Sequence, residues 1–382
     1  MISHPLPKPL TIPLAIPKFA PQANAQTLVE FLDEDVTPVA HQIDTAPSVL
    51  FEMFKKASDL GLLTPKTPDD FEGAGLSAVG YRQLQCEIAR RSGALAFLLT
   101  QHQSAASFLL SGENERLKND YLPKMASGER RVGVGFSHLR RVHPPVTAHR
   151  VPGGYRLSGE VPWVTGAGLF EEFVGAAVIT ADGEENGGAA VFGLLPLMSC
   201  QGISDQGVSG ALFVDEPMAL SGMASTQTVR VQLADWFLAD DLVIGTRPAG
   251  WLAERDRANP LGPIGLIKGC TEAAQAIMAE SLRRRQITHG IEQQLAAQTR
   301  ELFAQTPEMV ALPVDAYGQK VAFRGQAIAL MTTCAQAAVI ASSGAANALH
   351  HPARRVQGEA LVFSVSGQST DGAIASLNSL MQ

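Results

Sequence analysis

The chain has 382 residues, of which 46% are hydrophobic and 18% are charged, and its formal net charge is −7 at pH 7. This length is too great for one hydrophobic core and predicts two or three domains. An acidic chain lacks the basic face that binds phosphate backbones, so we expect no nucleic-acid partner.

The cysteines and the N-terminus indicate the cellular compartment. The four cysteines are far apart in the sequence, and they form no CxxC pair and have no histidine at metal-ligand spacing. This usage is typical of a reducing compartment and predicts no metal site. The N-terminus has no basic-then-apolar signal sequence, and no apolar run reaches the roughly 18 residues of a membrane span. We therefore expect a cytoplasmic protein with no membrane partner.

Three regions follow a proline-rich N-terminal arm at residues 1–22. Residues 23–128 show helical spacing of apolar side chains, and Ser77 is placed to cap the start of a helix. In residues 129–247 the period changes to two and short runs alternate with turns, which predicts a small antiparallel β-domain. Residues 248–382 are helical again, with expected helices at 264–285, 292–303, 317–349 and 359–381. Four such helices predict a bundle.

The C-terminal helices also predict self-association. The segment 317–349 is so rich in alanine, glycine and serine that helices can approach closely and leave an apolar face that needs a partner. We expect a homodimer or homotetramer.

The segment 153–168 combines a tight turn with an indole and a hydroxyl. Gly153-Gly154 predicts a hairpin, and the strand after it leads to Trp163 and Thr165. Gly166 and Gly168 follow and leave room for a ligand near the backbone. A flat aromatic cofactor needs such an arrangement, whereas the alternative is a core tryptophan in an ordinary β-barrel.

Three motifs of the chain resemble segments of the acyl-CoA dehydrogenase family. They are GGYRLSGEVPWVTGAG from residue 153, LGLLTPKTPDDFEGAGLS from residue 60, and YLPKMASGE from residue 121. The resemblance implies an α+β multidomain fold, with an N-terminal helical domain, a central antiparallel β-barrel domain and a C-terminal four-helix bundle.

The resemblance also implies a bound FAD. It places Trp163 against the isoalloxazine ring and Thr165 in hydrogen bonding with it, and Ser137 and His138 stand where the family has a hydroxyl that reaches the ring. A turn that includes Gly344 corresponds to the family turn that often touches the ADP part of a flavin in a second subunit.

Two parts of the family's catalytic pattern are altered here. The signature TEPxAGSD, which helps to hold acyl-CoA, is replaced by a shorter segment that starts at Ser137. The usual catalytic glutamate is replaced by Ser366 or Gly367, neither of which can remove a proton from carbon at neutral pH. Glu254 resembles the base that some members place at the start of the bundle, although it also fits a solvated or salt-bridged carboxylate.

The resemblance implies an FAD-dependent oxidoreductase that acts on CH–CH bonds of an acyl-CoA or related small-molecule substrate, with an electron-transfer partner. Two alternatives remain open because the usual glutamate is absent. One is a flavin-dependent monooxygenase of the same fold, and the other is a family relative without catalytic activity.

Overall fold

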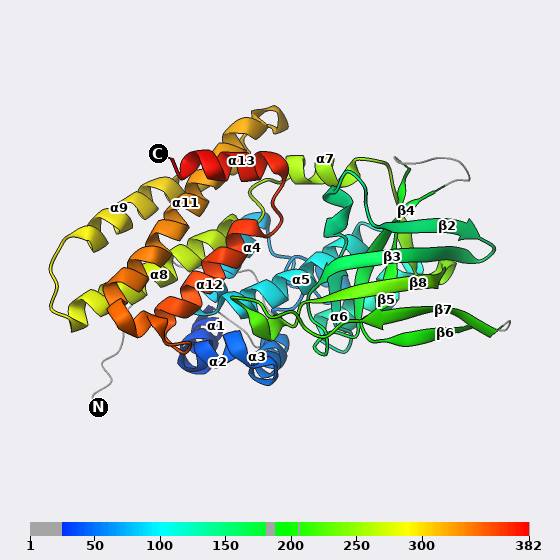
Figure 1. The fold of residues 1–382 in the computed structure, drawn as a ribbon, viewed down its shortest axis with the longest axis horizontal. Coiled ribbons are helices and arrows are strands. Elements are labelled where there is room, and N and C mark those ends of the chain that lie inside the picture. The colour runs from blue at the N-terminus through cyan, green and yellow to red at the C-terminus, as the bar shows by residue number, and fades with distance from the viewer. Residues whose placement is uncertain (1–24, 181–187, 205–206, 382) are drawn as a thin grey trace.

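The computed structural model describes residues 25–180, 188–204 and 207–381, and the predicted arm at residues 1–22 lies outside them. A helical region, a β-sheet and a second helical region follow one another along the chain (Figure 1). The α+β architecture is therefore confirmed. The domain boundaries at residues 128 and 247 stay a prediction, although the sheet begins at Val132 and ends at Arg247.

Helices in the first region start where short polar side chains cap them. The Ser77 hydroxyl accepts a hydrogen bond from the Gly80 amide, as predicted, and Ser92 and Asn114 cap the next two helices in the same way. The helices are α1 (Ala25–Glu30), α2 (Ala40–Thr45), α3 (Pro47–Asp59), α4 (Ala78–Arg91), α5 (Gly93–Leu110) and α6 (Glu115–Ala126), and a π-helical turn (Phe31–Val36) follows α1.

One nine-stranded sheet forms the middle of the molecule. Its strands are β1 (Val132–Gly135), β2 (Val146–Val151), β3 (Gly154–Val164), β4 (Glu172–Ile179), β5 (Ala190–Pro196), β6 (Cys200–Ser204), β7 (Gly207–Val214), β8 (Val229–Ala239) and β9 (Val243–Arg247). The strand order is β6-β7-β8-β3-β2-β4-β5-β9, and β1 pairs with β4.

The sheet is mixed rather than purely antiparallel. Most neighbours are antiparallel, but β4 runs parallel to both β1 and β2. The β2–β3 hairpin turns at Gly153, which has a φ of 78°. The antiparallel strand β3 ends near the residue where β2 begins. The chain then passes to the other side of β2, so β4 runs in the same direction as β2. The prediction of an antiparallel domain needs this correction, and β6 and β7 were not predicted.

The second helical region contains α7 (Trp251–Ala258), α8 (Ile264–Arg284), α9 (Ile291–Ala304), α10 (Thr306–Ala311), α11 (Tyr317–Ser342), α12 (Pro352–Val365) and α13 (Thr370–Ser379). Two predicted segments differ from these. The long helix expected at 317–349 ends at Ser342 and continues as a 3₁₀ turn (Ser343–Asn347). The segment expected at 359–381 is two helices, because Gly367 adopts a φ of 59° between them.

An aromatic cluster joins the first helical region to the sheet and to α7. Phe108 on α5 packs against Phe192 on β5, with ring centroids 4.6 Å apart, and both rings contact Trp251 and Phe136. These rings fix the start of α7 against the sheet. The position of α7 matters because it forms one wall of the cleft described below.

The stretch Val314–Asn347 is long and apolar enough to cross a membrane by length and composition. Of its most apolar window, 44% is buried inside the fold, where α11 packs against α8, α12 and α13. Partial burial of this kind also occurs in the core helix of a soluble protein.

Candidate active site

A cleft of about 520 Å³ lies where the sheet meets the C-terminal helices. Its walls are the segment after β1, the ends of β4 and β5, the start of α7, and the turn between α12 and α13. Figure 1 shows α7 and α13 next to each other at this junction. The lining residues that bear on its chemistry are Arg140, Arg141, Phe192, Arg247, Trp251, Asp256, Arg257, Tyr317, Gln368, Ser369 and Asp371.

Positive charge prevails along the cleft, which has four lining arginines and two lining aspartates. Arg140 holds Asp256 in a two-point ion pair, with N–O distances of 2.6 and 2.8 Å, so the loop after β1 is tied to α7. The Arg257 guanidinium lies 5.1 Å from the centre of the Tyr317 ring. Cations that remain beyond the paired charges favour an anionic ligand.

A buried arginine holds the backbone of the turn at Ser366 and Gly367 in place. Arg324 on α11 donates hydrogen bonds to the carbonyl oxygens of both residues, at 2.9 and 3.2 Å, and to that of Pro260. Burial lowers the pKa of Arg324, and the charge of Asp256 opposes that shift. At the position where the family carries its glutamate, the backbone is therefore hydrogen-bonded to the Arg324 guanidinium.

Glu254, the predicted base, has an exposed side chain on α7. It is not among the residues that line the cleft, whereas its neighbours Ala253 and Asp256 are. The structure therefore leaves its proposed role untested.

Asp371 is a carboxylate in the cleft that the sequence did not reveal. It stands in the first turn of α13, two residues after the capping residue Ser369, whose hydroxyl accepts a hydrogen bond from the Gly372 amide. The pair Ser369-Thr370 could have indicated a new helix start here. The sequence was instead interpreted as one continuous helix, so Asp371 was placed in its middle.

Trp163 lies near the end of β3 and Thr165 directly follows that strand, and their side chains differ in exposure. The Trp163 side chain is 50% exposed, which does not fit the alternative of a core tryptophan. Thr165 is buried, and its hydroxyl lies 3.1 Å from that of Thr228. An exposed indole beside a buried hydroxyl suits one face of a planar ring such as a flavin.

The two glycines after Thr165 have different roles. A side chain at Gly166 would come within 2.3 Å of the Phe170 ring, so this glycine is required for packing. Nothing lies within 4 Å of the position that a side chain at Gly168 would take. The expected open space near the backbone is therefore present at Gly168 only.

Ser137 and His138 begin a 3₁₀ turn (Ser137–Arg140) directly after β1. Strand β1 packs closely on the end of β3, since a side chain at Gly133 would lie 3.0 Å from the Thr165 carbonyl oxygen. The fold thus brings both residues toward the Trp163 end of β3. Ser137 is exposed, whereas His138 is buried.

His138 is held as a neutral ring. Its Nε2 lies 3.1 Å from the Ala176 carbonyl oxygen and must carry the proton to donate to it. Burial, partly opposed by this hydrogen bond, lowers the pKa of His138 to about 4. Nδ1 is buried with no partner in the described part of the chain, which leaves one acceptor for a ligand donor.

Gly344 lies at the opposite end of the bundle from the sheet, where α11 ends (Figure 1). This end is basic: the Arg285 guanidinium donates to the Ala341 carbonyl at 2.8 Å, and the hydroxyls of Ser281 and Ser342 are 2.9 Å apart. A diphosphate would be stabilised at such a position. The contact of the Gly344 turn with a flavin held by a second subunit stays a prediction.

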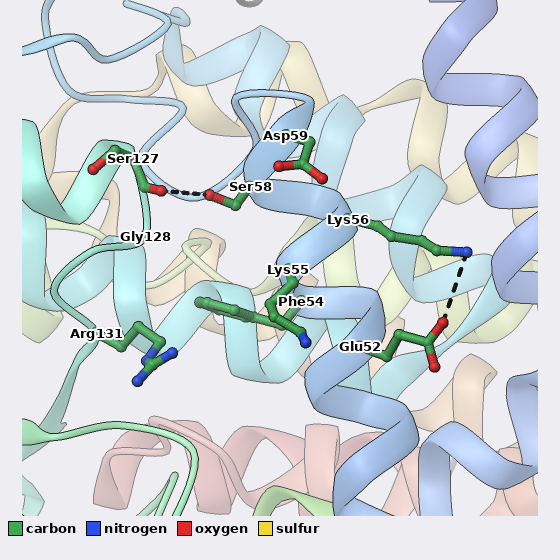
Figure 2. A pocket seen from close by; sticks show the side chains of 9 residues that line it. All are labelled: Glu52, Phe54, Lys55, Lys56, Ser58, Asp59, Ser127, Gly128 and Arg131. Atoms are coloured by element: carbon green, nitrogen blue, oxygen red, sulfur yellow. Dashed lines mark hydrogen bonds and ion pairs between the residues drawn. The ribbon is translucent and has the colours of Figure 1, made fainter.

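A second hollow of about 470 Å³ lies between α3 and the segment that joins α6 to β1 (Figure 2). Three of its charged side chains, Glu52, Lys56 and Arg131, are paired within the chain. Lys56 lies 2.7 Å from Asp35 and 3.9 Å from Glu52, and Arg131 pairs with Glu171. This hollow has one lining arginine and one lining aromatic ring, Phe54, whereas the cleft has four arginines and three aromatic rings.

No group of three or more His, Cys, Asp or Glu side chains in residues 25–180, 188–204 and 207–381 is arranged to hold a metal ion.

Comparison with known proteins agrees with the fold. Residues 21–129 match the family described as "Acyl-CoA dehydrogenase, N-terminal domain". Isovaleryl-CoA dehydrogenase, mitochondrial, of Pongo abelii is 31% identical over 147 residues, which are 37% of this chain and 35% of that protein. An acyl-CoA dehydrogenase of Bacillus subtilis is 27% identical over 166 residues, which are 41% and 43%. The aligned parts thus span well under two thirds of either relative.

Solved structures match over almost the whole chain at low identity. The glutaryl-coenzyme A dehydrogenase glutaryl-CoA complex has a TM-score of 0.74 at 16% identity and covers 93% of each chain. KijD3 in complex with FMN and dTDP-3-amino-2,3,6-trideoxy-4-keto-3-methyl-D-glucose has a TM-score of 0.72 at 17% identity and covers 93% and 92%. Nitrososynthase from Micromonospora carbonacea var. africana has a TM-score of 0.73 at 16% identity and covers 97% and 98%.

The structural matches show the fold, and the sequence matches are to acyl-CoA dehydrogenases in both curated relatives and the family description. Together these comparisons support a divergent member of the acyl-CoA dehydrogenase family, whose members are flavoproteins.

Proposed function

We propose that this protein is an FAD-dependent oxidoreductase that acts on CH–CH bonds of an acyl-CoA or related substrate bound in the cleft. The observation that carries the proposal is the cleft itself, whose lining combines four arginines with the aromatic rings of Trp251 and Phe192 and with the start of α13. A CoA thioester brings a diphosphate, which suits the cationic wall, and an acyl chain, which suits the rings of Trp251 and Phe192.

The chain offers residues that fit a flavin. Trp163 would pack on the ring and Thr165 would hydrogen-bond to it, while Ser137 and the free Nδ1 of His138 lie at the adjoining end of β1. The basic end of a second subunit, at Gly344, would hold the diphosphate. A bound flavin supplies the acceptor for hydride, and FAD rather than FMN is part of this proposal.

Proton removal from the substrate needs a carboxylate in reach of its α-carbon. Asp371 lines the cleft and Glu254 does not, so the two are competing candidates.

The absorbance spectrum of the purified protein tests the proposal. A yellow protein whose flavin is bleached without oxygen by an acyl-CoA supports it, and a colourless protein that does not take up added FAD contradicts it. We further propose that the protein is cytoplasmic, forms a homodimer or homotetramer, and passes its electrons to an electron-transfer partner.

A flavin-dependent monooxygenase is the second candidate, because one observation favours it. The turn that holds the family's glutamate has no carboxylate at Ser366 or Gly367 and is fixed by Arg324. A monooxygenase does not require that glutamate, and nitrososynthase and KijD3 share this fold. Rapid reoxidation of reduced flavin by oxygen, together with oxygenated product, would favour this candidate over the first.

A further inference from the structure

One ion pair joins two walls of the cleft. Arg140 ends the turn after β1, and its guanidinium holds the Asp256 carboxylate of α7 at 2.6 and 2.8 Å. Both side chains line the cleft. Among the residues that the structure describes, no other hydrogen bond or ion pair joins this turn to α7. This pair is therefore the polar link between the two walls.

Helix α7 is anchored at its start and held by charged side chains farther along. Trp251, its first residue, packs within the aromatic cluster that joins α5 to the sheet. Asp256 lies more than one turn later, where its bond to Arg140 holds α7 against the segment after β1. Beyond it, the Arg257 guanidinium lies 5.1 Å from the centre of the Tyr317 ring, and the end of the helix is exposed. Charged side chains rather than apolar ones therefore fix this half of α7, and Trp251 can serve as its pivot.

The ion pair is exposed enough to separate. The side chains of Arg140 and Asp256 are 27% and 18% exposed, so water reaches both charges. Each charge regains hydration when the two move apart, which makes separation easier than it is for a fully buried pair. The segment that follows Arg140 includes Val142, which is already 86% exposed. Movement of this segment would therefore not uncover a buried apolar side chain at Val142.

The charge of the cleft favours opening of the pair by an anion. Arg141 and Arg257 also line the cleft, and each is the next residue after a member of the pair. An anion that these arginines attract meets Arg140 and is repelled by Asp256. Because a phosphate group accepts two N–H donors from one guanidinium, as a carboxylate does, it competes with Asp256 for Arg140.

We propose that the Arg140–Asp256 pair is a gate of the cleft, and that a ligand bearing phosphate groups opens it by drawing Arg140 away from Asp256. The closed state is the ion-paired wall described above. In the open state Arg140 binds the phosphate, Asp256 turns toward water, and α7 separates from the segment after β1. This inference goes beyond the proposed function, because it concerns entry to the cleft and not the reaction that follows.

Hydrogen exchange followed by mass spectrometry measures the opening of the gate. Asp256→Asn removes the charge that holds Arg140 and changes the shape little, so amide exchange in residues 137–141 and 251–258 should become about tenfold faster. Arg140→Asp combined with Asp256→Arg restores an ion pair of reversed direction and should return both rates toward those of the parent. Unchanged exchange in Asp256→Asn, or fast exchange in the reversed pair, would overturn the gate.

Arg150 and Asp240 provide a matched control. They also form a two-point ion pair, between β2 and the 3₁₀ turn after β8 (Asp240–Leu242), and neither residue lines the cleft. Asp240→Asn should leave exchange in both cleft segments at the rate of the parent. Exchange in α5 should stay at that rate in both asparagine variants, which distinguishes local opening from loss of the whole fold. Equal acceleration of α5 and the cleft segments in Asp256→Asn would count against a gate.

The response to an anion distinguishes a gate from a fixed structural contact. Pyrophosphate is added to the parent protein, and sodium chloride at the same ionic strength serves as the comparison. Pyrophosphate should speed exchange in both cleft segments several-fold, and it should not do so in Asp256→Asn, in which the gate is already open. If pyrophosphate speeds exchange in the parent no more than chloride does, anions do not open the pair and the proposal is wrong.

Coenzyme A then separates this inference from the proposed function. Its association is followed by tryptophan fluorescence after rapid mixing, since Trp251 lines the cleft. The association rate constant should rise about fivefold in Asp256→Asn and stay unchanged in Asp240→Asn. If coenzyme A does not bind while pyrophosphate still opens the parent, the proposed substrate fails and the gate stands. If coenzyme A binds to the parent and to Asp256→Asn at equal rates, the pair is no barrier to entry and the gate fails.

Discussion

At the scale of single residues, Trp163 is the position at which flavin binding is most directly tested. Half of its side chain is exposed near the end of β3, which leaves an aromatic surface that a flavin ring could cover. Trp163→Ala removes the stacking surface, which is worth about 1 kcal/mol or more, so we expect the FAD dissociation constant to rise at least fivefold. This dissociation constant is measured from the flavin fluorescence that appears when the loaded protein is diluted.

Phe213 provides a matched control for that substitution. It is likewise a strand residue with 51% exposure, but it lies on β7, toward the other edge of the sheet. Phe213→Ala should leave flavin retention unchanged. Equal retention in Trp163→Ala and the parent would refute the assignment of Trp163 to the cofactor.

The competing bases are also distinguished residue by residue. Asp371→Asn should slow flavin bleaching by an acyl-CoA by roughly 10² to 10⁴ if Asp371 is the general base, whereas Glu254→Gln should have little effect. The reverse result assigns the base to Glu254. Stopped-flow absorbance at saturating substrate measures the rate. Unchanged rates in both variants would mean that neither carboxylate removes the proton.

At the scale of secondary-structure elements, His138 links the turn after β1 to strand β4 through its bond to the Ala176 carbonyl. Its pKa is lowered from 6.5 to about 4 in the folded protein, so the unfolded chain binds the proton more readily over that interval. Stability from the neutral ring is therefore present above pH 6.5 and lost as the pH falls toward 4.

This linkage predicts a pH-dependent effect of substitution. Between pH 7 and pH 5, His138→Gln should lose about 2 kcal/mol less unfolding free energy than the parent does. Urea unfolding at the two pH values measures the difference. His149→Gln, at an exposed histidine on β2, should follow the parent. If the parent and His138→Gln lose equal stability, the buried neutral ring is not the cause.

The order of helices and strands could be predicted from the sequence, because the spacing of apolar side chains and the helix-capping residues depend only on neighbouring positions. Ser77 caps α4, and the switch to a period of two near residue 130 marks the sheet. The parallel pairing of β4 could not be predicted, because it depends on which strands become neighbours. The break between α12 and α13 could not be predicted, because only one residue with a left-handed backbone, Gly367, separates two segments of apolar helical spacing.

The candidate site was harder to predict, because it also depends on which distant segments become neighbours in the fold. Trp163, Thr165, Ser137 and His138 were found because they lie in two segments with family-like patterns, and the fold brings those segments together. Asp371 and the Arg140–Asp256 pair belong to the cleft through contacts between residues more than 100 positions apart. Nothing in the local sequence around Arg140 distinguishes it from an exposed arginine.

At the scale of the whole molecule, the C-terminal helices carry several exposed apolar side chains. Leu361 and Val365 lie one turn apart on α12, and Ile374 and Leu377 lie one turn apart on α13, each more than half exposed. Paired positions of this kind make stripes rather than scattered side chains.

The stripes carry the last prediction, which concerns assembly through the bundle. A symmetric partner would cover them and bring the Gly344 turn of one chain toward the flavin of another, so assembly and flavin binding should fail together. Leu361→Glu combined with Leu377→Glu should convert the oligomer to a monomer at micromolar concentration and weaken flavin retention. Val79→Glu, at an isolated exposed valine on α4, should do neither. Light scattering and flavin absorbance on the same sample measure both effects.

A parent protein that is already a monomer at this concentration would refute assembly through these helices. A double variant that becomes a monomer yet keeps its flavin would show that each subunit holds the cofactor alone.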